Sequence, residues 1–228
     1  MDQVELDIEG MSEIDRTLMI ADLAGYTALT ETHGAMHASE VVLRFGRMAE
    51  ESLEPGVVIV DRIGDQVLCA GGDTQAVLRT LLRLCLRVER EPGFLGMQAG
   101  IHKGSVVARE GRLFGSPLNL TARLAAHAHE GQILCTGPIA SVAGGFPGVS
   151  VRAIGQKRFR NVSSPMLVFE LLRGDRRGLV SATDPVCRMQ VEIGGAATSI
   201  PFGGENYHFC SAECARLFTA APERYVSA

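Results

Sequence analysis

The sequence has no apolar run long enough to cross a membrane as a helix. It also lacks a basic N-terminal segment followed by an apolar stretch, which is the pattern of a secretory signal peptide. Lys and Arg form no run, the formal net charge is −4, and the isoelectric point lies near 5.9. A surface that binds nucleic acid needs clustered positive charge. We therefore expect a soluble cytoplasmic protein without a membrane or nucleic-acid partner.

The length and composition predict one full domain with a small appendage. The chain has 228 residues, of which 46% are hydrophobic, so a sizeable core is available. We expect an N-terminal tail over residues 1–14, a large domain over 15–173, a linker over 174–183 and a small domain over 184–228.

The six cysteines are distributed unevenly. Three of them lie inside apolar segments, where a free cysteine behaves as a small hydrophobic residue: Cys69, Cys85 and Cys135. The other three, Cys187, Cys210 and Cys214, are crowded into the last part of the chain. In a cytosolic protein, such a concentration of thiols favours a metal site over disulfides.

The central stretch is Arg16–Thr30. Its apolar run from Leu18 to Ala21 is typical of a buried strand, and it ends at Asp22 before a turn and a helix-compatible segment. Asp22 either caps that helix or belongs to a site. Asp65 favours the site, since it lies in the turn of a hairpin predicted from the short apolar runs around it. In one sheet the two carboxylates converge, which suits Mg²⁺ or Mn²⁺.

Three helices are predicted from spacing and capping. One covers Ala38–Leu53, a second starts after Asp73, and a third starts at Ser116-Pro117 and ends near Gly131. Asn119 and Arg123 lie four residues apart, and so on one face of the third helix, where they form either a surface pair or part of a site. Strands are expected over 95–102, 133–135, 149–154 and 167–171.

Four segments together resemble the catalytic domain of the class III adenylate and guanylate cyclases, over roughly residues 15–172: ADLAGYTALT, RIGDQVLCAGG, GIHKGSVVAREGRLFGSPLNLTARL and KRFRNVSSPMLVFEL. The resemblance implies an α+β domain with a ferredoxin-like core, a central mixed sheet flanked by helices. It also implies an enzyme, a phosphorus–oxygen lyase. In this reaction the ribose 3′-hydroxyl of ATP or GTP attacks the α-phosphate and pyrophosphate leaves.

The resemblance also implies roles for particular residues. Two Mg²⁺ or Mn²⁺ ions would bind to Asp22 and Asp65, Asn119 would orient the ribose, and Arg123 would stabilise charge on the α-phosphate. Arg160 falls where cyclases have a Lys that contacts the triphosphate. In that family the metal acids and the Asn/Arg pair come from different subunits, so a head-to-tail homodimer with two composite sites is expected.

Two positions depart from the family pattern. Asp61 and Arg112 stand where cyclases that use ATP carry a Lys and an Asp to read adenine, so the charges are inverted. Guanylate cyclases carry an acid at the first of these positions, which makes Asp61 compatible with guanine. Alternatively, Asp61 and Arg112 pair with each other and leave the base pocket shut.

The segments DPVCRMQV, YHFCS and PERY, together with Cys214, resemble the YHS domain and the related TRASH spacing, small treble-clef-like modules of heavy-metal trafficking and sensing. The residues predict a hairpin over 199–209 and a helix from Ser211. Cys187, Cys210 and Cys214 would bind Zn²⁺ or Cu⁺. His208 is the expected fourth ligand, because it lies two residues from Cys210 on a strand and so on the same face.

The hypothesis from the sequence is a nucleotidyl cyclase, adenylate by default, whose appended module binds or senses a heavy metal. The alternative is a catalytically silent cyclase-like dimer that acts as a nucleotide or metal sensor or as a scaffold. A third hypothesis is metal storage or delivery by the C-terminal module.

Overall fold

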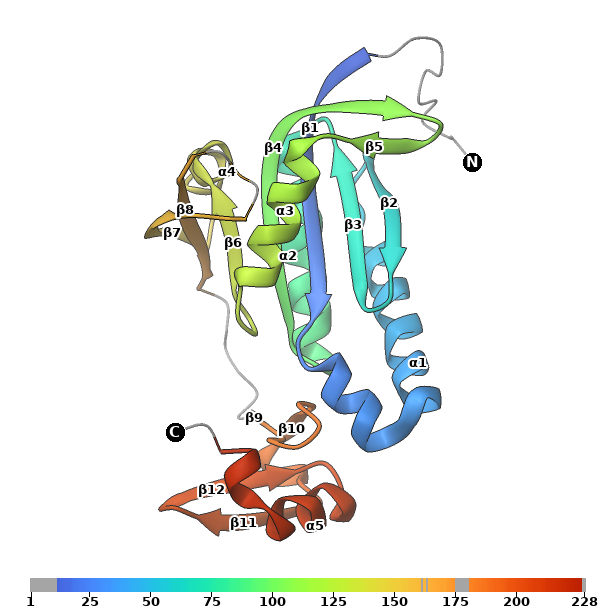
Figure 1. Ribbon diagram of the computed structural model, residues 1–228, viewed down its shortest axis with the longest axis vertical. Helices are drawn as coiled ribbons and strands as arrows, with labels where there is room; N and C mark the ends of the chain where they lie inside the picture. Colours follow the sequence, from blue (N-terminus) through green and yellow to red (C-terminus); the bar gives the residue numbers. More distant parts are fainter. Residues whose placement is uncertain (1–11, 161, 163, 175–180, 227–228) are drawn as a thin grey trace.

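The structure is a computed structural model that describes residues 12–160, 162, 164–174 and 181–226. A large α+β part is built on one mixed sheet, and a small part lies beyond one end of that sheet (Figure 1). In chain order the elements of the large part are β1 (Ser12–Leu23), α1 (Tyr26–Ser52), β2 (Val57–Ile63), β3 (Gln66–Gly71), α2 (Thr74–Arg90), β4 (Met97–Arg109), β5 (Arg112–Phe114), α3 (Ser116–His127), β6 (Ile133–Thr136), α4 (Gly137–Ala143), β7 (Val149–Lys157) and β8 (Met166–Arg173).

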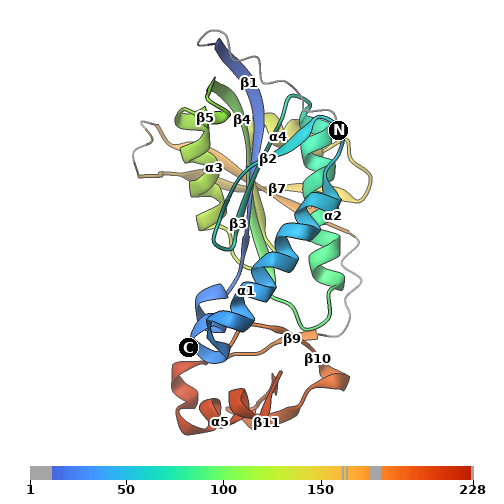
Figure 2. The same cartoon turned by 90° about the vertical axis from the view of Figure 1, so that its right-hand side faces the viewer.

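The sheet has the strand order β2-β3-β1-β4-β6-β8-β7, and β5 pairs with β4 outside this path. Strand β1 is central and antiparallel to both of its neighbours, whereas β4 and β6 are parallel. Figure 2 shows α3 on one side of the sheet and α1 and α2 on the other. The apolar residues of β1, Leu18 and Met19 among them, are fully buried, as expected for a strand covered on both faces. The predicted fold class is confirmed.

The start of the chain differs from the expectation. Strand β1 begins at Ser12 and already pairs there with Ala108 of β4, so the expected tail over 1–14 is too long. Residues 1–11 and 175–180, which include most of the expected linker, lie outside the described residues.

The helices begin where backbone geometry and caps place them. Asp73 caps α2 by accepting a hydrogen bond from the amide of Gln75 (2.9 Å), as predicted. Helix α1 starts directly after Gly25, in the segment expected to be compatible with a helix, and it includes the predicted helix over Ala38–Leu53. The φ of 91° at Gly25 is easily adopted only by glycine. Asp22 therefore does not cap this helix. Helix α1 is interrupted by the non-helical backbone of Gly34 (φ 82°, ψ 164°), and α3 ends at His127, before Gly131.

The small part contains β9 (Ser181–Thr183), β10 (Gln190–Glu192), η1 (Ile193–Gly195), β11 (Thr198–Phe202), β12 (Glu205–Phe209), α5 (Ala212–Ala220) and η2 (Pro222–Arg224). The predicted hairpin is β11–β12, and the predicted helix α5 is capped by Ser211, whose hydroxyl accepts from the amide of Cys214. The ring of Phe218 is buried against several neighbours and forms the core of this part: Phe202, Tyr207, Phe209 and Tyr225.

The two parts share one continuous core. The amide of Gln190 donates to the carbonyl of Phe94 (2.7 Å), and Leu95 forms a β-bridge with Met189. Both contacts lie just before β4, at the end of the sheet where β1 terminates (Figure 1). Within the described ranges, no helix combines the length and apolar character needed to span a bilayer.

Candidate functional site

Two carboxylates meet at the end of the central strand. Asp22 is near the end of β1, where it pairs with Gln66, and Asp65 lies in the β2–β3 turn directly before that residue. Leu23 donates its amide to the Asp65 carbonyl (3.4 Å), which ties the turn to the strand end. The structure thus brings Asp22 and Asp65 together.

Burial, and then the charge of Asp65, raise the pKa of Asp22 to about 6. Burial also raises the pKa of Asp65. Gln98 of β4 partly offsets the rise at Asp22 by donating to its carboxylate (3.2 Å). The two carboxylates repel each other when both are ionised, and a divalent cation between them would offset this repulsion. Their oxygen atoms are the ligands that Mg²⁺ or Mn²⁺ prefers.

Asp22 and Asp65 line a cleft of about 400 Å³. Its walls are residues 22–27, Asp65, Gln98, residues 128–130 and Arg188. The first turn of α1 faces this cleft with Gly25 as its N-cap and no side-chain cap. Amide groups at a helix N-terminus without a side-chain cap attract anions. The cleft can therefore bind a cation at the two carboxylates and an anion at the start of α1.

Asn119 and Arg123 lie elsewhere on the same chain. Both are exposed on α3 and neither lines the cleft. Helix α3 packs closely on β4 at Gly100, where an added Cβ would lie 2.4 Å from the amide nitrogen of Ala125. The Asn/Arg face of α3 therefore remains available on the surface of one chain.

The two residues at the base-reading positions do not pair within the chain. Asp61 is on β2 and accepts a hydrogen bond from the amide of Arg62, whereas Arg112 is on β5. Strands β3, β1 and β4 separate β2 from β5 in the sheet, and the ion pairs of the described residues include none between Asp61 and Arg112. The alternative in which Asp61 and Arg112 pair with each other is therefore not formed within one chain. Arg160 is exposed in the turn after β7.

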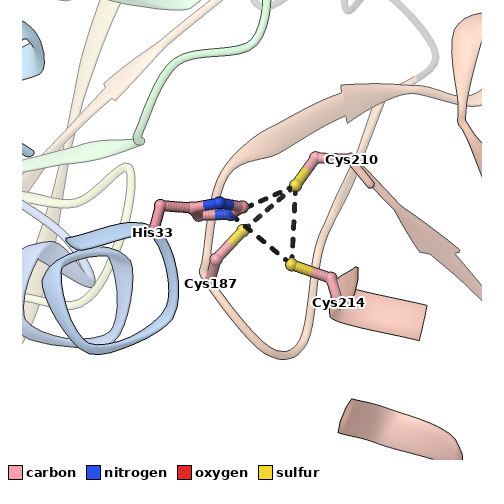
Figure 3. Close-up of side chains that lie close together, drawn as sticks. All are labelled: His33, Cys187, Cys210 and Cys214. Atoms are coloured by element: carbon pink, nitrogen blue, oxygen red, sulfur yellow. Dashed lines mark hydrogen bonds between the residues drawn. The ribbon is translucent and has the colours of Figure 1, made fainter. Parts of the chain in front are cut away.

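A second cluster joins the two parts of the molecule. The thiols of Cys187, Cys210 and Cys214 and the imidazole of His33, which comes from α1, all lie within 4.8 Å of one another (Figure 3). The Sγ atoms of Cys187 and Cys210 are 3.4 Å apart, and those of Cys210 and Cys214 are 3.6 Å apart. Nε2 of His33 lies 3.5 Å from Sγ of Cys214 and 3.6 Å from Sγ of Cys210.

These distances fit a tetrahedral ion. Zinc bonds to sulfur and nitrogen imply edges of about 3.8 Å between sulfurs and about 3.6 Å between sulfur and nitrogen. Hydrogen bonding with the thiols of Cys187 and Cys214 lowers the pKa of Cys210, whereas hydrogen bonding with Cys210 raises the pKa of Cys187, so Cys210 ionises before Cys187. Three sulfurs and one imidazole make a closed donor set for a soft or borderline ion.

His208 is not part of this cluster, and the expectation that it supplies the fourth ligand is wrong. Its Nδ1 bonds instead to Oγ of Ser199 across the hairpin (2.7 Å). Strand β12 ends at Phe209, so the alternation that would place residues 208 and 210 on one face stops before Cys210. His33 supplies the fourth donor of the cluster. In the sequence it is marked only by its position beside Gly34 in a helical stretch.

Asp184 organises the thiols and was also missed. Its buried carboxylate accepts from the amides of Val186 (2.8 Å) and Cys210 (2.8 Å), and more distantly from that of Cys187 (3.4 Å). One side chain thus holds the backbone at two ligands that are far apart in sequence.

Arg188 belongs to the small part, and it lines the cleft of the large part. It follows Cys187, has a φ of 68°, and forms an ion pair with Glu130 (3.0 Å). Its side chain packs on Gly25, where an added Cβ would lie 2.2 Å from Cβ of Arg188. The acid cleft and the thiol cluster are therefore linked by adjacent residues.

Comparisons with known proteins agree with this division. Residues 182–228 match the YHS domain family. The chain is 30% identical over 164 residues to a pH-sensitive adenylate cyclase of Mycobacterium tuberculosis, which covers 71% of this chain and 41% of that protein. A stretch of 45 residues is 47% identical to a copper-transporting P-type ATPase of Rhizobium leguminosarum bv. viciae and covers 20% of this chain and 5% of that protein.

The fold itself is similar to that of an adenylyl cyclase of P. aeruginosa, with a TM-score of 0.62 and 20% identity. That match covers 75% of this chain and all of the other. The chain spans less than half the length of the curated relatives that it matches.

Proposed function

We propose that this chain, which joins a domain of the class III nucleotidyl cyclase fold to a C-terminal YHS domain, converts a nucleoside triphosphate into a 3′,5′-cyclic nucleotide and pyrophosphate. The observation that carries the proposal is the convergence of Asp22 and Asp65 in a cleft beside an uncapped helix N-terminus. Relatives named adenylate cyclases favour ATP as the substrate. Asp61 at a base-reading position keeps GTP as the other candidate.

Each residue has a defined task in this proposal. Asp22 and Asp65 would hold two Mg²⁺ or Mn²⁺ ions, which would lower the pKa of the 3′-hydroxyl and neutralise charge on the phosphates. Asn119 orients the ribose, and Arg123 stabilises charge on the α-phosphate as it is attacked. Arg160 contacts the triphosphate.

The active assembly is a homodimer. Asn119 and Arg123 are exposed and lie outside the cleft of their own chain, which supports a site completed by a second copy. A head-to-tail pair related by a two-fold axis would form two equivalent sites, each with acids from one chain and the Asn/Arg pair from the other.

The YHS domain, together with His33 of α1, binds one soft or borderline ion, Zn²⁺ or Cu⁺. The support is the set of four donor atoms at tetrahedral separations, contributed by Cys187, Cys210, Cys214 and His33. The likeness to part of a copper-transporting ATPase is consistent with either ion.

The test is turnover of ATP and of GTP with Mg²⁺ or Mn²⁺, read out as cyclic nucleotide and pyrophosphate. Asp22→Asn and Asp65→Asn should each abolish the product, because the ions lose a carboxylate. Asp15→Asn, an exposed acid on the same strand, is the matched control and should retain full activity. Nucleotide binding without any cyclic product would instead support a catalytically silent sensor or scaffold.

A further inference from the structure

The acid cleft has little positive charge of its own. Among the described residues that line it, Arg188 is the only Lys or Arg, and it belongs to the YHS domain. The catalytic domain contributes acids, the Gln98 amide and the start of α1 to these walls. A triphosphate bound here carries several negative charges, and Arg123 and Arg160 lie outside these walls, so Arg188 is placed to offset part of this charge from within them.

The backbone of Arg188 is held in an unfavourable conformation. Its φ of 68° lies in the left-handed region, which is unfavourable for a non-glycine residue. Glycine would fit this turn without that cost. The strained backbone therefore belongs to a residue whose side chain lines the cleft of the other domain.

Glu130 keeps the side chain in place. Its carboxylate pairs with Arg188 (3.0 Å) and also accepts from Thr183 (3.3 Å) and from Gln190. Three residues of the YHS domain thus converge on one acid at the edge of the cleft. The ion pair holds the guanidinium beside the cleft, and Arg can exchange a carboxylate for a phosphate because both suit its bidentate geometry.

The thiol cluster contains residues from both sides of the contact between Arg188 and Gly25. Cys187 directly precedes Arg188, and His33 lies on α1, whose N-cap Gly25 supports the Arg188 side chain. An ion bound by Cys187 and His33 therefore connects the loop that carries Arg188 to the helix that borders the cleft.

We infer that Arg188 of the YHS domain binds the polyphosphate of the nucleotide in the Asp22/Asp65 cleft, and that the ion at His33 and the three cysteines holds it there. This inference rests on the proposed function to the extent that the cleft receives a nucleoside triphosphate. The catalytic site then contains residues of both domains, and loss of the soft metal weakens nucleotide binding.

The experiment measures binding of inorganic tripolyphosphate and of ATP, each with Mg²⁺, to the full chain by calorimetry. Arg188→Gly should weaken both affinities by about tenfold or more, the loss expected for hydrogen bonds to a charged group. The same variant should keep or raise the thermal unfolding temperature, because glycine relieves the strained φ. Arg188→Lys should recover part of the affinity. Arg216→Ala is the matched control, since Arg216 is an exposed, ion-paired arginine of the same domain on α5, and it should bind like the wild type.

The metal dependence is tested on protein stripped of metal and then supplied with Mg²⁺ alone or with Mg²⁺ and Zn²⁺. Zn²⁺ should tighten tripolyphosphate binding by the wild type and leave Arg188→Gly unchanged. Unaltered or tighter binding by Arg188→Gly overturns the inference, and tighter binding would mean that Arg188 obstructs the cleft. A wild type that binds neither probe also overturns it. If the protein forms no cyclic product but its binding of tripolyphosphate and ATP depends on Arg188, the proposed function is overturned and the inference is supported.

Discussion

Nε2 of His33 lies 3.5 Å from Sγ of Cys214, although the two residues are 181 positions apart in the chain. His33 belongs to the helix that follows the acid-bearing strand, and Cys214 belongs to the last helix of the YHS domain. An ion bound by these side chains would join the two domains, so metal loading and domain docking would become one equilibrium.

His33→Ala should weaken the soft-metal site. Removing one of four donors opens the coordination sphere, and we expect the affinity for Zn²⁺ to fall by at least about tenfold. The measurement is competition with a chromophoric chelator, supported by the visible spectrum of the Co²⁺ form, which reports coordination number. His208→Ala is the matched control and should bind Zn²⁺ normally, because the His208 imidazole is engaged with Ser199. Equal losses in the two variants would contradict the assignment of His33.

Gly25→Ala should separate the two domains. An alanine at a φ of 91° costs about 1 kcal/mol, and its Cβ would lie 2.2 Å from Cβ of Arg188. The variant should unfold at a lower temperature and expose the YHS domain to limited proteolysis. Combining it with Arg188→Gly removes the clash but not the backbone cost, so the double variant should recover part of the stability. If the effects of the two substitutions on stability were purely additive, the two residues would not contact each other in solution.

A mixing experiment tests the composite site. Asp22→Asn and Arg123→Ala should each be inactive as homodimers, since every site lacks one group. A mixed dimer has one intact site, so equal amounts of the two chains should recover about a quarter of the wild-type activity after random exchange. The readout is cyclic nucleotide formation as a function of protein concentration. No recovery, with exchange verified by mass spectrometry of the dimers, would place all the groups within one chain.

The stability of the large domain should fall at acidic pH because of His102. Its Nδ1 bonds to Oγ1 of Thr136 (2.8 Å), and burial lowers the pKa of its imidazole. Above the unfolded value of about 6.5 both states are neutral and this histidine adds no pH dependence. Below it the unfolded chain takes up the proton first, so stability falls by up to about 1.4 kcal/mol per pH unit.

The measurement is the free energy of unfolding by urea between about pH 7.5 and pH 5.5. The difference between the wild type and His102→Gln isolates the histidine, because the carboxylates whose pKa is raised, such as Asp22 and Asp184, titrate in both proteins. A difference that stays constant with pH would contradict this prediction.

Local features of the sequence were enough for most of the fold. The apolar run before Asp22 predicts a buried strand, the turn at Gly64-Asp65 predicts the β2–β3 hairpin, and Asp73 predicts the start of α2. Each of these depends on contacts within a few residues, such as a cap or a tight turn, so local spacing carries the information. Three cysteines in a short C-terminal segment likewise predicted a thiol cluster, which the structure contains.

The errors arose where local periodicity ends. His208 was expected beside Cys210 because alternation along a strand puts such residues on one face, but β12 stops at Phe209. Asp22 as a helix cap was an open alternative until the structure placed Gly25 in that position, with a backbone angle that sequence spacing does not reveal.

By itself the sequence determined most of the longer elements and singled out the two acids and the three thiols, because these follow from neighbours along the chain. Only the tertiary structure decided that His33 completes the thiol cluster and that Arg188 enters the acid cleft. Both depend on how one domain docks against the other, through contacts such as Gln190 with Phe94 and Arg188 with Glu130, between residues too far apart in sequence for any local pattern to relate them.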